Sequence, residues 1–300
     1  MELRHLRYFV AVAEERHFTR AAERLGIGQP PLSQQIQQLE KEIGGQLFHR
    51  LSRGVELTEA GQVFFEEAKA ILAQADHAKA TVERVARGEQ GQIRVGFTGS
   101  ASFNIFVPYA LRLFKERFPA VSLSLVESTT PRLNGSVSHG QLDVGFVRPP
   151  FNYGDNLTVL PLFEEDMLIA LPFAHALAGQ GALPISALAE ETFILYPRAV
   201  GPGLYDRIIS ACQKAGFSPR IGQEAPQLSS AVNLVAAGLG VAVVPASMNH
   251  VHADSVSYHP IAGDSVQAPL GLVYRRTERS AAVRNFVATV REAAANHRGT

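Results

Sequence analysis

The side chains best suited to reading bases lie on a short helical stretch near the N-terminus. Leu32, Ile36 and Leu39 repeat at i, i+4 and i+7, which predicts one buried helix face. Amides and a hydroxyl occupy the opposite side. Glutamine can form two hydrogen bonds with adenine, and serine can bond to base edges or phosphates. A plain solvated face is the alternative. The predicted contacts to double-stranded DNA here are Gln29, Pro30, Pro31, Ser33, Gln34 and Gln37.

The flanking sequence predicts that this stretch is the second helix of a helix-turn-helix. Phe18, Ala21, Ala22 and Leu25 repeat at helical spacing, and the glycine-flanked residues 26–28 predict a tight turn. Helix, short glycine turn and helix together make the helix-turn-helix arrangement. In such a motif the second helix enters the major groove.

Residues 47–57 predict two short strands joined by a turn, a wing beside the helix pair. Arg50 and Arg53 fall within it, where they could contact phosphates or a minor groove. Bulk charge gives no support, because residues 1–60 hold eight basic and eight acidic side chains. The expectation of DNA binding therefore rests on where the charges sit.

Residues 58–87 predict one long helix with an apolar seam. Its apolar residues recur in alternating steps of four and three, the a/d pattern of about three heptads. Such a seam needs a partner helix, so we expect a homodimer and, on its two-fold axis, a palindromic operator. A helix lying on its own domain is the alternative. The predicted seam consists of Phe64, Ala68, Ile71, Ala75, Ala78, Val82 and Val85.

From residue 91 onward, apolar runs that suit buried strands alternate with amphipathic helices. This order predicts mostly parallel sheets with helices on both faces. The polar, glycine-flanked residues 88–91 predict a hinge before the first strand. Strands are expected at 93–97, 121–126, 142–147, 167–171, 193–196, 241–244 and 270–274, and helices at 105–118, 132–139, 204–215, 228–237 and 280–295.

Length and composition limit the alternatives. The 300 residues allow two domains, or three small ones, and the formal net charge is zero. The single cysteine, Cys212, excludes an internal disulfide and a Cys-rich zinc site, and a reducing cytoplasm is the expected compartment. We see no secretory signal and no apolar run long enough for a membrane span. His250, His252 and Asp254 read better as surface residues than as metal ligands.

The stretch HFTRAAERLGIGQPPLSQQIQQLEKEIGGQLFHRLSRGVELTEAG, residues 17–61, resembles the signature of LysR-type transcription regulators. The pieces that follow match the family's order, so the resemblance covers essentially the whole chain. The opening MELRHLRYFVAVAEE and the double proline resemble the subgroup that controls degradation of benzoate, catechol and chlorocatechol. The resemblance implies a cytoplasmic activator that forms homotetramers and acts on RNA polymerase.

The family fold implies an α/β chain in three parts. An all-α winged helix-turn-helix would span residues 1–58, a dimerising linker helix 59–88 and an effector-binding domain 89–300. That domain would have two Rossmann-like lobes, as in type-II periplasmic binding proteins. Lobe I would cover about 91–160 and 268–300, and lobe II about 161–267. A small carboxylate, aromatic or muconate-like, would bind between the lobes.

Polar residues at strand ends predict where this effector binds. Ligands in such sheets bind beyond the carboxyl ends of strands, and helix N-termini there favour anions. The resemblance implies that Ser100 and Thr130 contact the effector and that Arg148 lies near a deeper anion site. Helix capping and a salt bridge are the respective alternatives. The full predicted set is Ser100, Ala101, Ser102, Thr129, Thr130, Arg148, Pro202 and Gly203.

Two other classes of protein share features of this chain. A solute-binding protein has similar lobes, but it would not carry a winged helix and would need a signal peptide. An enzyme is the other alternative, yet we find no P-loop, no G-x-S-x-G elbow and no nucleophile with a base. We therefore expect no catalytic residue, no metal and no cofactor.

Overall fold

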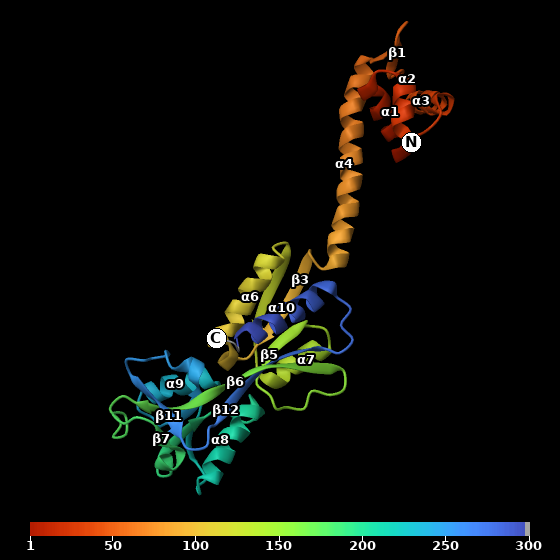
Figure 1. Ribbon diagram of the computed structural model, residues 1–300. Coiled ribbons are helices and arrows are strands. Elements are labelled where there is room, and N and C mark those ends of the chain that lie inside the picture. Colours follow the sequence, from red (N-terminus) through yellow and green to blue (C-terminus); the bar gives the residue numbers. More distant parts are fainter. Residues whose placement is uncertain (298–300) are drawn as a thin grey trace. The chain divides into compact units, whose positions relative to one another are not determined.

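The computed structural model describes residues 1–297 and divides into two compact units, Met1–Arg84 and a second that begins at Val85 (Figure 1). The first unit holds three short helices, a two-stranded wing and most of a long helix. Its elements are α1 (Leu3–Glu15), α2 (Phe18–Leu25), α3 (Gln29–Ile43), β1 (Phe48–Arg50), β2 (Val55–Leu57) and α4 (Glu59–Arg87). The helix-turn-helix and the wing are where the sequence predicts them.

The turns of this unit depend on glycine. Gly26 ends α2 at a φ of 69°, a left-handed conformation that glycine adopts without strain. Gly54 at the wing tip has a φ of 90°, and a Cβ there would lie 2.6 Å from the Arg16 carbonyl oxygen. Val55 N–H donates to that same carbonyl, so the wing is tied to the turn between α1 and α2. The core beneath is apolar and includes Phe9, Leu32 and Leu39, all fully buried.

The linker helix α4 divides the predicted seam into two parts. Phe64 and Ala68 pack into the core of the first unit, and the Phe64 ring lies 4.9 Å from that of Phe9. At these two residues the helix therefore packs on its own domain, which was the alternative to a dimer seam. Ile71, Val82 and Val85 remain 39%, 69% and 52% exposed. Only the part of the seam from Ile71 onward is free for a partner helix.

The second unit contains the predicted α/β elements. Its main sheet runs β4-β3-β5-β12-β6-β11-β7, with β10 also paired to β6. Its strands are β3 (Gly91–Phe97), β4 (Val121–Glu127), β5 (Val144–Val147), β6 (Leu157–Pro172), β7 (Leu183–Pro184), β8 (Thr192–Leu195), β9 (Arg220–Glu224), β10 (Ala242–Pro245), β11 (Val256–Ala262) and β12 (Gln267–Arg275). Its helices are α5 (Gly99–Ser102), α6 (Phe106–Arg117), α7 (Thr130–Ser138), α8 (Pro202–Lys214), α9 (Leu228–Ala236) and α10 (Ala281–His297), with short 3₁₀ turns at Ile185–Leu188 and Ala246–Met248.

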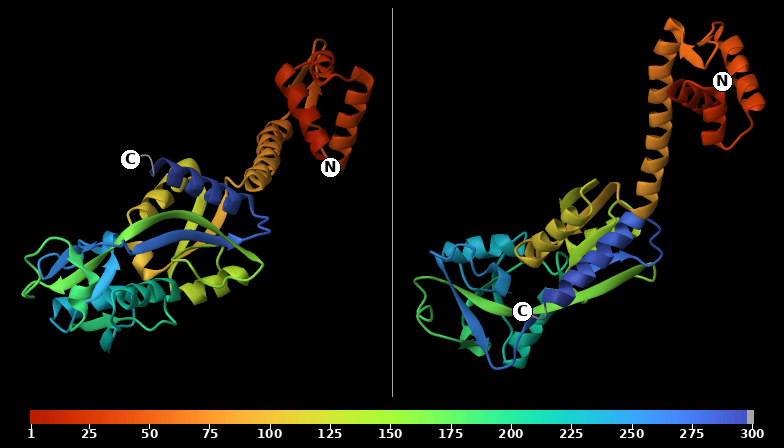
Figure 2. Two further views of the ribbon diagram at one scale, coloured as in Figure 1. Left: turned by 60° about the horizontal axis from the view of Figure 1, so that its bottom comes forward. Right: turned by 45° about the horizontal axis from the view of Figure 1, so that its top comes forward.

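The expectation of mostly parallel sheets is wrong for this unit. The pairs β3–β4, β3–β5, β7–β11 and β8–β9 are parallel, but β12 is antiparallel to both β5 and β6, and β10 and β11 are antiparallel to β6, so the pairing is mixed. The reason is that β6 and β12 are long crossing strands that run in opposite directions side by side (Figure 2). The strand predicted at 167–171 is only the end of β6.

Separate apolar cores define two lobes. We call lobe I the part with β3, β4, β5, α6, α7 and α10; α6 and α10 pack together on one face of its sheet, and α7 covers the other. Lobe II is the part with β8, β9, β10, β11, α8 and α9, around its own core. The boundaries predicted near 160 and 268 fall within β6 and at the start of β12.

Gly88 in the predicted hinge and Gly140, which follows α7, allow a matched test of backbone packing. Gly88 and Gly140 share a φ of 72°, but a Cβ at Gly88 would lie 2.4 Å from the Ala282 nitrogen, whereas nothing lies within 4 Å of one at Gly140. Both substitutions to alanine strain the backbone by about 1–2 kcal/mol. We expect Gly88→Ala to lower the unfolding midpoint clearly more than Gly140→Ala in calorimetry. Equal midpoints would contradict the close packing of Gly88 against α10.

Candidate functional site

The exposed face of α3 carries the residues predicted to contact DNA. Its buried face is Leu32, Ile36 and Leu39, as predicted. The helix begins at Gln29, directly after the N-cap Gly28. On the outer side Ser33 is half-buried, and the exposed predicted contacts are Gln29, Pro30, Pro31, Gln34 and Gln37. Side chains at the start of a helix that protrudes in this way can reach base edges in a major groove.

The wing adds two exposed cations to the same unit. Arg50 lies at the end of β1 with its guanidinium 5.7 Å from the Phe18 ring centroid, so α2 helps to position it. Arg53 is exposed in the turn between β1 and β2. Arg24, by contrast, is paired with Glu14 and Glu15. Arg50 and Arg53 are therefore better placed than Arg24 to contact phosphates.

A second candidate site lies between the lobes of the second unit. A cavity of about 40 Å³, partly open to solvent, lies where strands of lobe I end and helices of lobe II begin. The lobes touch around it: Thr130 N–H donates to the Val200 carbonyl at 3.3 Å, and a Cβ at Gly99 would lie 2.5 Å from Gln227 Oε1. Its lining comprises Thr98, Gly99, Ser100, Ser128, Thr129, Thr130, Arg148, Tyr196, Val200, Gly201, Leu204, Gln227 and Leu228.

Two hydrogen-bonding atoms on this lining have no partner among the described residues. Thr98 Oγ1 and Arg148 Nε are buried and make no hydrogen bond there. A buried polar atom without a partner costs about 1–3 kcal/mol, so such atoms in a cavity point to a missing ligand or water. Two helices also begin at this cavity: α7 starts at Thr130 and α9 starts at Leu228. Hydroxyl, guanidinium and helix N-termini together suit an anion.

Arg148 is held by a network that crosses the unit. Its Nη2 donates to Glu165 at 2.6 Å and to the Ser100 carbonyl, and its Nη1 donates to the Ala268 carbonyl. Burial lowers the pKa of Arg148, and the Glu165 carboxylate acts against that shift. A guanidinium stays charged in proteins regardless. The salt bridge is thus present, and Nε makes no hydrogen bond to the described residues, so it can donate to a ligand in the cavity.

Tyr196 lines the cavity on the lobe II side. Burial raises the pKa of its phenol, so the hydroxyl is protonated at neutral pH. It donates to the Gly201 carbonyl at 3.3 Å. The side chain therefore shapes the cavity without adding negative charge, which leaves Arg148 as its charged group.

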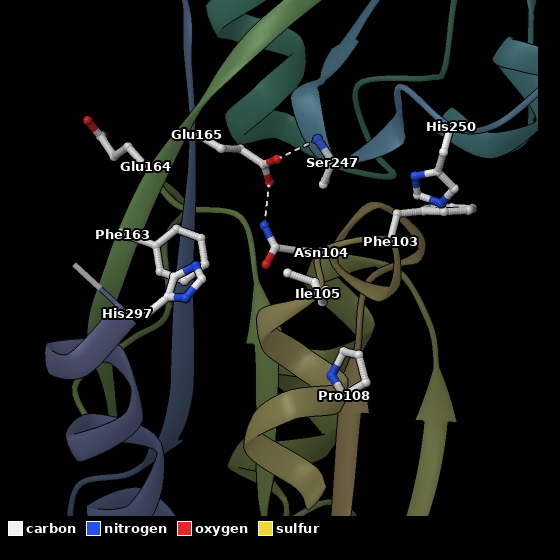
Figure 3. Close-up of a pocket in the computed structure, with 10 residues that line it drawn as sticks. All are labelled: Phe103, Asn104, Ile105, Pro108, Phe163, Glu164, Glu165, Ser247, His250 and His297. Atoms are coloured by element: carbon white, nitrogen blue, oxygen red, sulfur yellow. Dashed lines mark hydrogen bonds between the residues drawn. The ribbon is translucent and has the colours of Figure 1, made fainter. Parts of the chain in front are cut away.

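Glu165 also forms a wall of a larger cavity of about 720 Å³ (Figure 3). Its carboxylate accepts from Asn104 Nδ2 at 3.0 Å and from the Ser247 backbone N–H at 2.8 Å. The remaining lining is largely aromatic and apolar, with Phe103 near His250 and Phe163 near His297. One carboxylate thus links the loop before α6, the crossing strand β6 and lobe II.

The structure brings only part of the predicted effector set to the inter-lobe cavity. Ser100, Thr129, Thr130 and Arg148 line it. Four predicted residues lie elsewhere, because Ala101 is buried in the lobe I core, Ser102 is exposed with its hydroxyl on the Gly99 carbonyl, Pro202 starts α8, and Gly203 packs against the backbone of 148–150.

On the lobe II side, the sequence analysis chose Pro202 and Gly203 and missed two residues that line the cavity, Tyr196 and Gln227. Tyr196 directly follows β8, and Gln227 is the N-cap of α9. Both fall at a strand end or a helix start, the same signal that identified Ser100 and Thr130. Applying it to lobe II would have found them.

Other candidate sites gain nothing from the structure. Among residues 1–297, no group of three or more His, Cys, Asp or Glu side chains could hold a metal ion. His252 Nε2 is hydrogen-bonded to Asn233 Oδ1 at 2.8 Å. In the described part of the chain, no helix has the length and apolarity to cross a membrane.

Comparison with known proteins agrees with both units. Residues 3–62 match the family described as bacterial regulatory helix-turn-helix protein, lysR family, and residues 86–295 match the LysR substrate binding domain. The chain is 43% identical to the HTH-type transcriptional regulator BudR of Raoultella terrigena, over 96% of this chain and 99% of that protein. It is 38% identical to the Hca operon transcriptional activator HcaR of Escherichia coli K12, over 97% and 98%.

A solved structure gives the same result in three dimensions. Full-length CbnR in complex with its target DNA superposes with a TM-score of 0.85 at 30% identity, covering 98% of this chain and 100% of that one. The chain therefore belongs to the LysR family of transcription regulators: it is a DNA-binding regulator with an effector-binding domain, not an enzyme.

Proposed function

We propose that this protein is a cytoplasmic transcription activator switched by a small carboxylate bound between its lobes. The observation that carries the proposal is the inter-lobe cavity, where Thr98 Oγ1 and Arg148 Nε are buried without a partner. A carboxylate can accept from both groups and from the Ser100 and Thr130 hydroxyls. Activation is supported by the similarity to HcaR, the Hca operon transcriptional activator. Activation would require contact with RNA polymerase.

The dimensions of the cavity bear on which acid binds. A water molecule needs about 10–15 Å³ of such space, so about 40 Å³ suits a carboxylate with very few carbons. The aromatic or muconate-like acid predicted from the subgroup resemblance needs the lobes to separate further. We expect a short acid to bind the lobes as they stand and a larger one to bind only a more open arrangement.

Assembly follows from the exposed part of α4. We propose that the seam of Ile71, Ala75, Ala78, Val82 and Val85 pairs with the same seam of a second chain, and that two dimers form a tetramer. Two recognition helices related by a two-fold axis would read a palindromic operator. Effector binding would act by favouring one lobe arrangement over another, since a ligand shifts an equilibrium only through differential affinity.

Replacing Thr98 tests the proposed effector site. Thr98→Val removes the unpaired hydroxyl at nearly constant volume, so it should raise the unfolding midpoint of the ligand-free protein yet weaken acid binding by about tenfold. Ser102→Ala, whose hydroxyl bonds only its own turn, is the matched control. Calorimetry with acetate, propionate, benzoate and muconate measures both effects. A carboxylate bound equally by wild type and Thr98→Val would place the effector elsewhere.

A charge placed on α4 tests the proposed dimer contact. Ile71→Asp places a charge in the proposed seam, where pairing would bury it without a partner. Light scattering should show a lower mass for this variant than for wild type. Ala73→Asp, on the opposite side of the same helix and exposed, should keep the wild-type mass. If Ile71→Asp also keeps it, α4 is not the dimer contact.

Two substitutions separate base reading from phosphate contact in the DNA-binding unit. Gln34→Ala should lose about 1–3 kcal/mol of specific binding and relax the preference at one base pair. Arg53→Ala should instead weaken binding to every sequence and flatten its salt dependence. Anisotropy titrations against the DNA upstream of the gene and against a random duplex separate the two effects. Unchanged discrimination by Gln34→Ala would remove its base-reading role.

A further inference from the structure

A notch beside the start of α3 is lined by one predicted DNA contact, Pro31, and otherwise by residues with no role in the functions described above. It has a volume of about 430 Å³ and lies in the first unit. Three of its side chains can donate hydrogen bonds, and the others are apolar or glycine. The lining comprises Arg4, Tyr8, Ile27, Gly28, Pro31 and Gln35.

A buried histidine fixes the direction of the Gln35 amide. His5 is 4% exposed, and its Nδ1 accepts the Glu2 backbone N–H at 3.3 Å. A nitrogen that accepts has no proton, so in the neutral ring the proton is on Nε2. Nε2–H therefore donates to Gln35 Oε1, 2.9 Å away. With the Gln35 oxygen held by His5, its NH₂ group is available to a ligand, and Gln35 lines the notch.

The start of α3 needs such side-chain donors if it is to bind an anion. Its first turn has the positive end of the helix dipole. Pro30 and Pro31 occupy that turn, however, and proline has no N–H. Leu32 N–H is taken by the Gly28 carbonyl. The backbone at the start of α3 thus supplies a positive electrostatic field but few N–H donors. The side chains around the notch supply further hydrogen-bond donors.

We propose that this notch binds one phosphate of the DNA backbone. The phosphate oxygens accept from Gln35 Nε2 and the Tyr8 hydroxyl, and Arg4 supplies the charge. Arg4 is 57% exposed and is paired with the exposed Glu2 at 3.3 Å, so it can turn from that carboxylate to a phosphate. His5 acts as a positioning residue. The proposal rests on the DNA-binding function of the family and adds a contact that fixes the register of α3 in the groove.

The decisive variant is Gln35→Glu, tested in the full-length protein with a random-sequence duplex. Glutamate keeps an oxygen for His5 Nε2–H but replaces the outward NH₂ donor with an anionic oxygen. We expect the affinity for DNA to fall about tenfold or more with an unchanged unfolding midpoint, because a phosphate would then face a like charge. Gln74→Glu, an exposed position of α4, controls for the added negative charge.

A second variant tests the charge without altering the His5 contact. Arg4→Gln should reduce the slope of log affinity against log salt by about 0.9, the value for one phosphate contact on duplex DNA. Lys79→Gln, exposed on α4, should leave the slope unchanged. A purely structural role for Arg4 or Gln35 would change the unfolding midpoint rather than the slope.

The outcomes separate the notch from the wider function. Wild-type affinity in both Gln35→Glu and Arg4→Gln, with Arg53→Ala weakened, overturns the notch and leaves the DNA-binding function intact. Failure of the wild type to bind any duplex overturns both. If inorganic phosphate binds wild type more tightly than Gln35→Glu in calorimetry, but both bind DNA equally, the notch is a site for free anions. That result also overturns the proposal.

Discussion

The buried ion pair between Arg148 and Glu165 is the interaction on which the geometry of the second unit depends. Their side chains are 2% and 12% exposed, so both charges have lost most of their hydration. Such a pair is not a reliable source of stability, but removing one partner typically costs about 3–5 kcal/mol because the other charge is left buried. The network therefore constrains what can surround it. Glu165 accepts hydrogen bonds from Asn104 Nδ2 and the Ser247 backbone N–H, while Arg148 donates to the Ser100 and Ala268 carbonyls.

Through this network, an anion bound in the cavity would affect the hydrogen bonds that join the two lobes. Arg148 Nε faces no protein acceptor, so a bound carboxylate would share the guanidinium with Glu165. Sharing weakens the hold of Arg148 on Glu165, whose other oxygen accepts the Ser247 N–H of lobe II. Under the proposed function, occupancy of the cavity would then act on the lobe arrangement through the Glu165 carboxylate. That differential interaction is what a ligand needs in order to shift a conformational equilibrium.

How far the sequence predicts this structure depends on whether a local pattern or a tertiary contact decides each feature. The helices α2, α3 and α4 follow from apolar spacing, and Ser100 and Thr130 follow from their places at strand ends. The first half of β6 was not predicted, because Glu164, Glu165 and Asp166 interrupt its apolar run, and β9 was not predicted because every residue in it is exposed. The strand directions could not be inferred, since alternation of strands and helices does not reveal that β6 and β12 cross between lobes.

The linker helix α4 shows the same limit within a single element. The heptad pattern from Phe64 to Val85 correctly indicates an apolar stripe, but a period carries no information about which neighbour covers it. Phe9 and its surroundings cover Phe64 and Ala68, and from Ile71 onward the stripe is exposed. One continuous helix thus anchors the DNA-binding unit at its start and offers an apolar surface along the rest. Because a helix transmits rotation along its length, pairing through the exposed part would also fix the orientation of each α3 toward its partner, which is the geometric requirement for reading two half-sites.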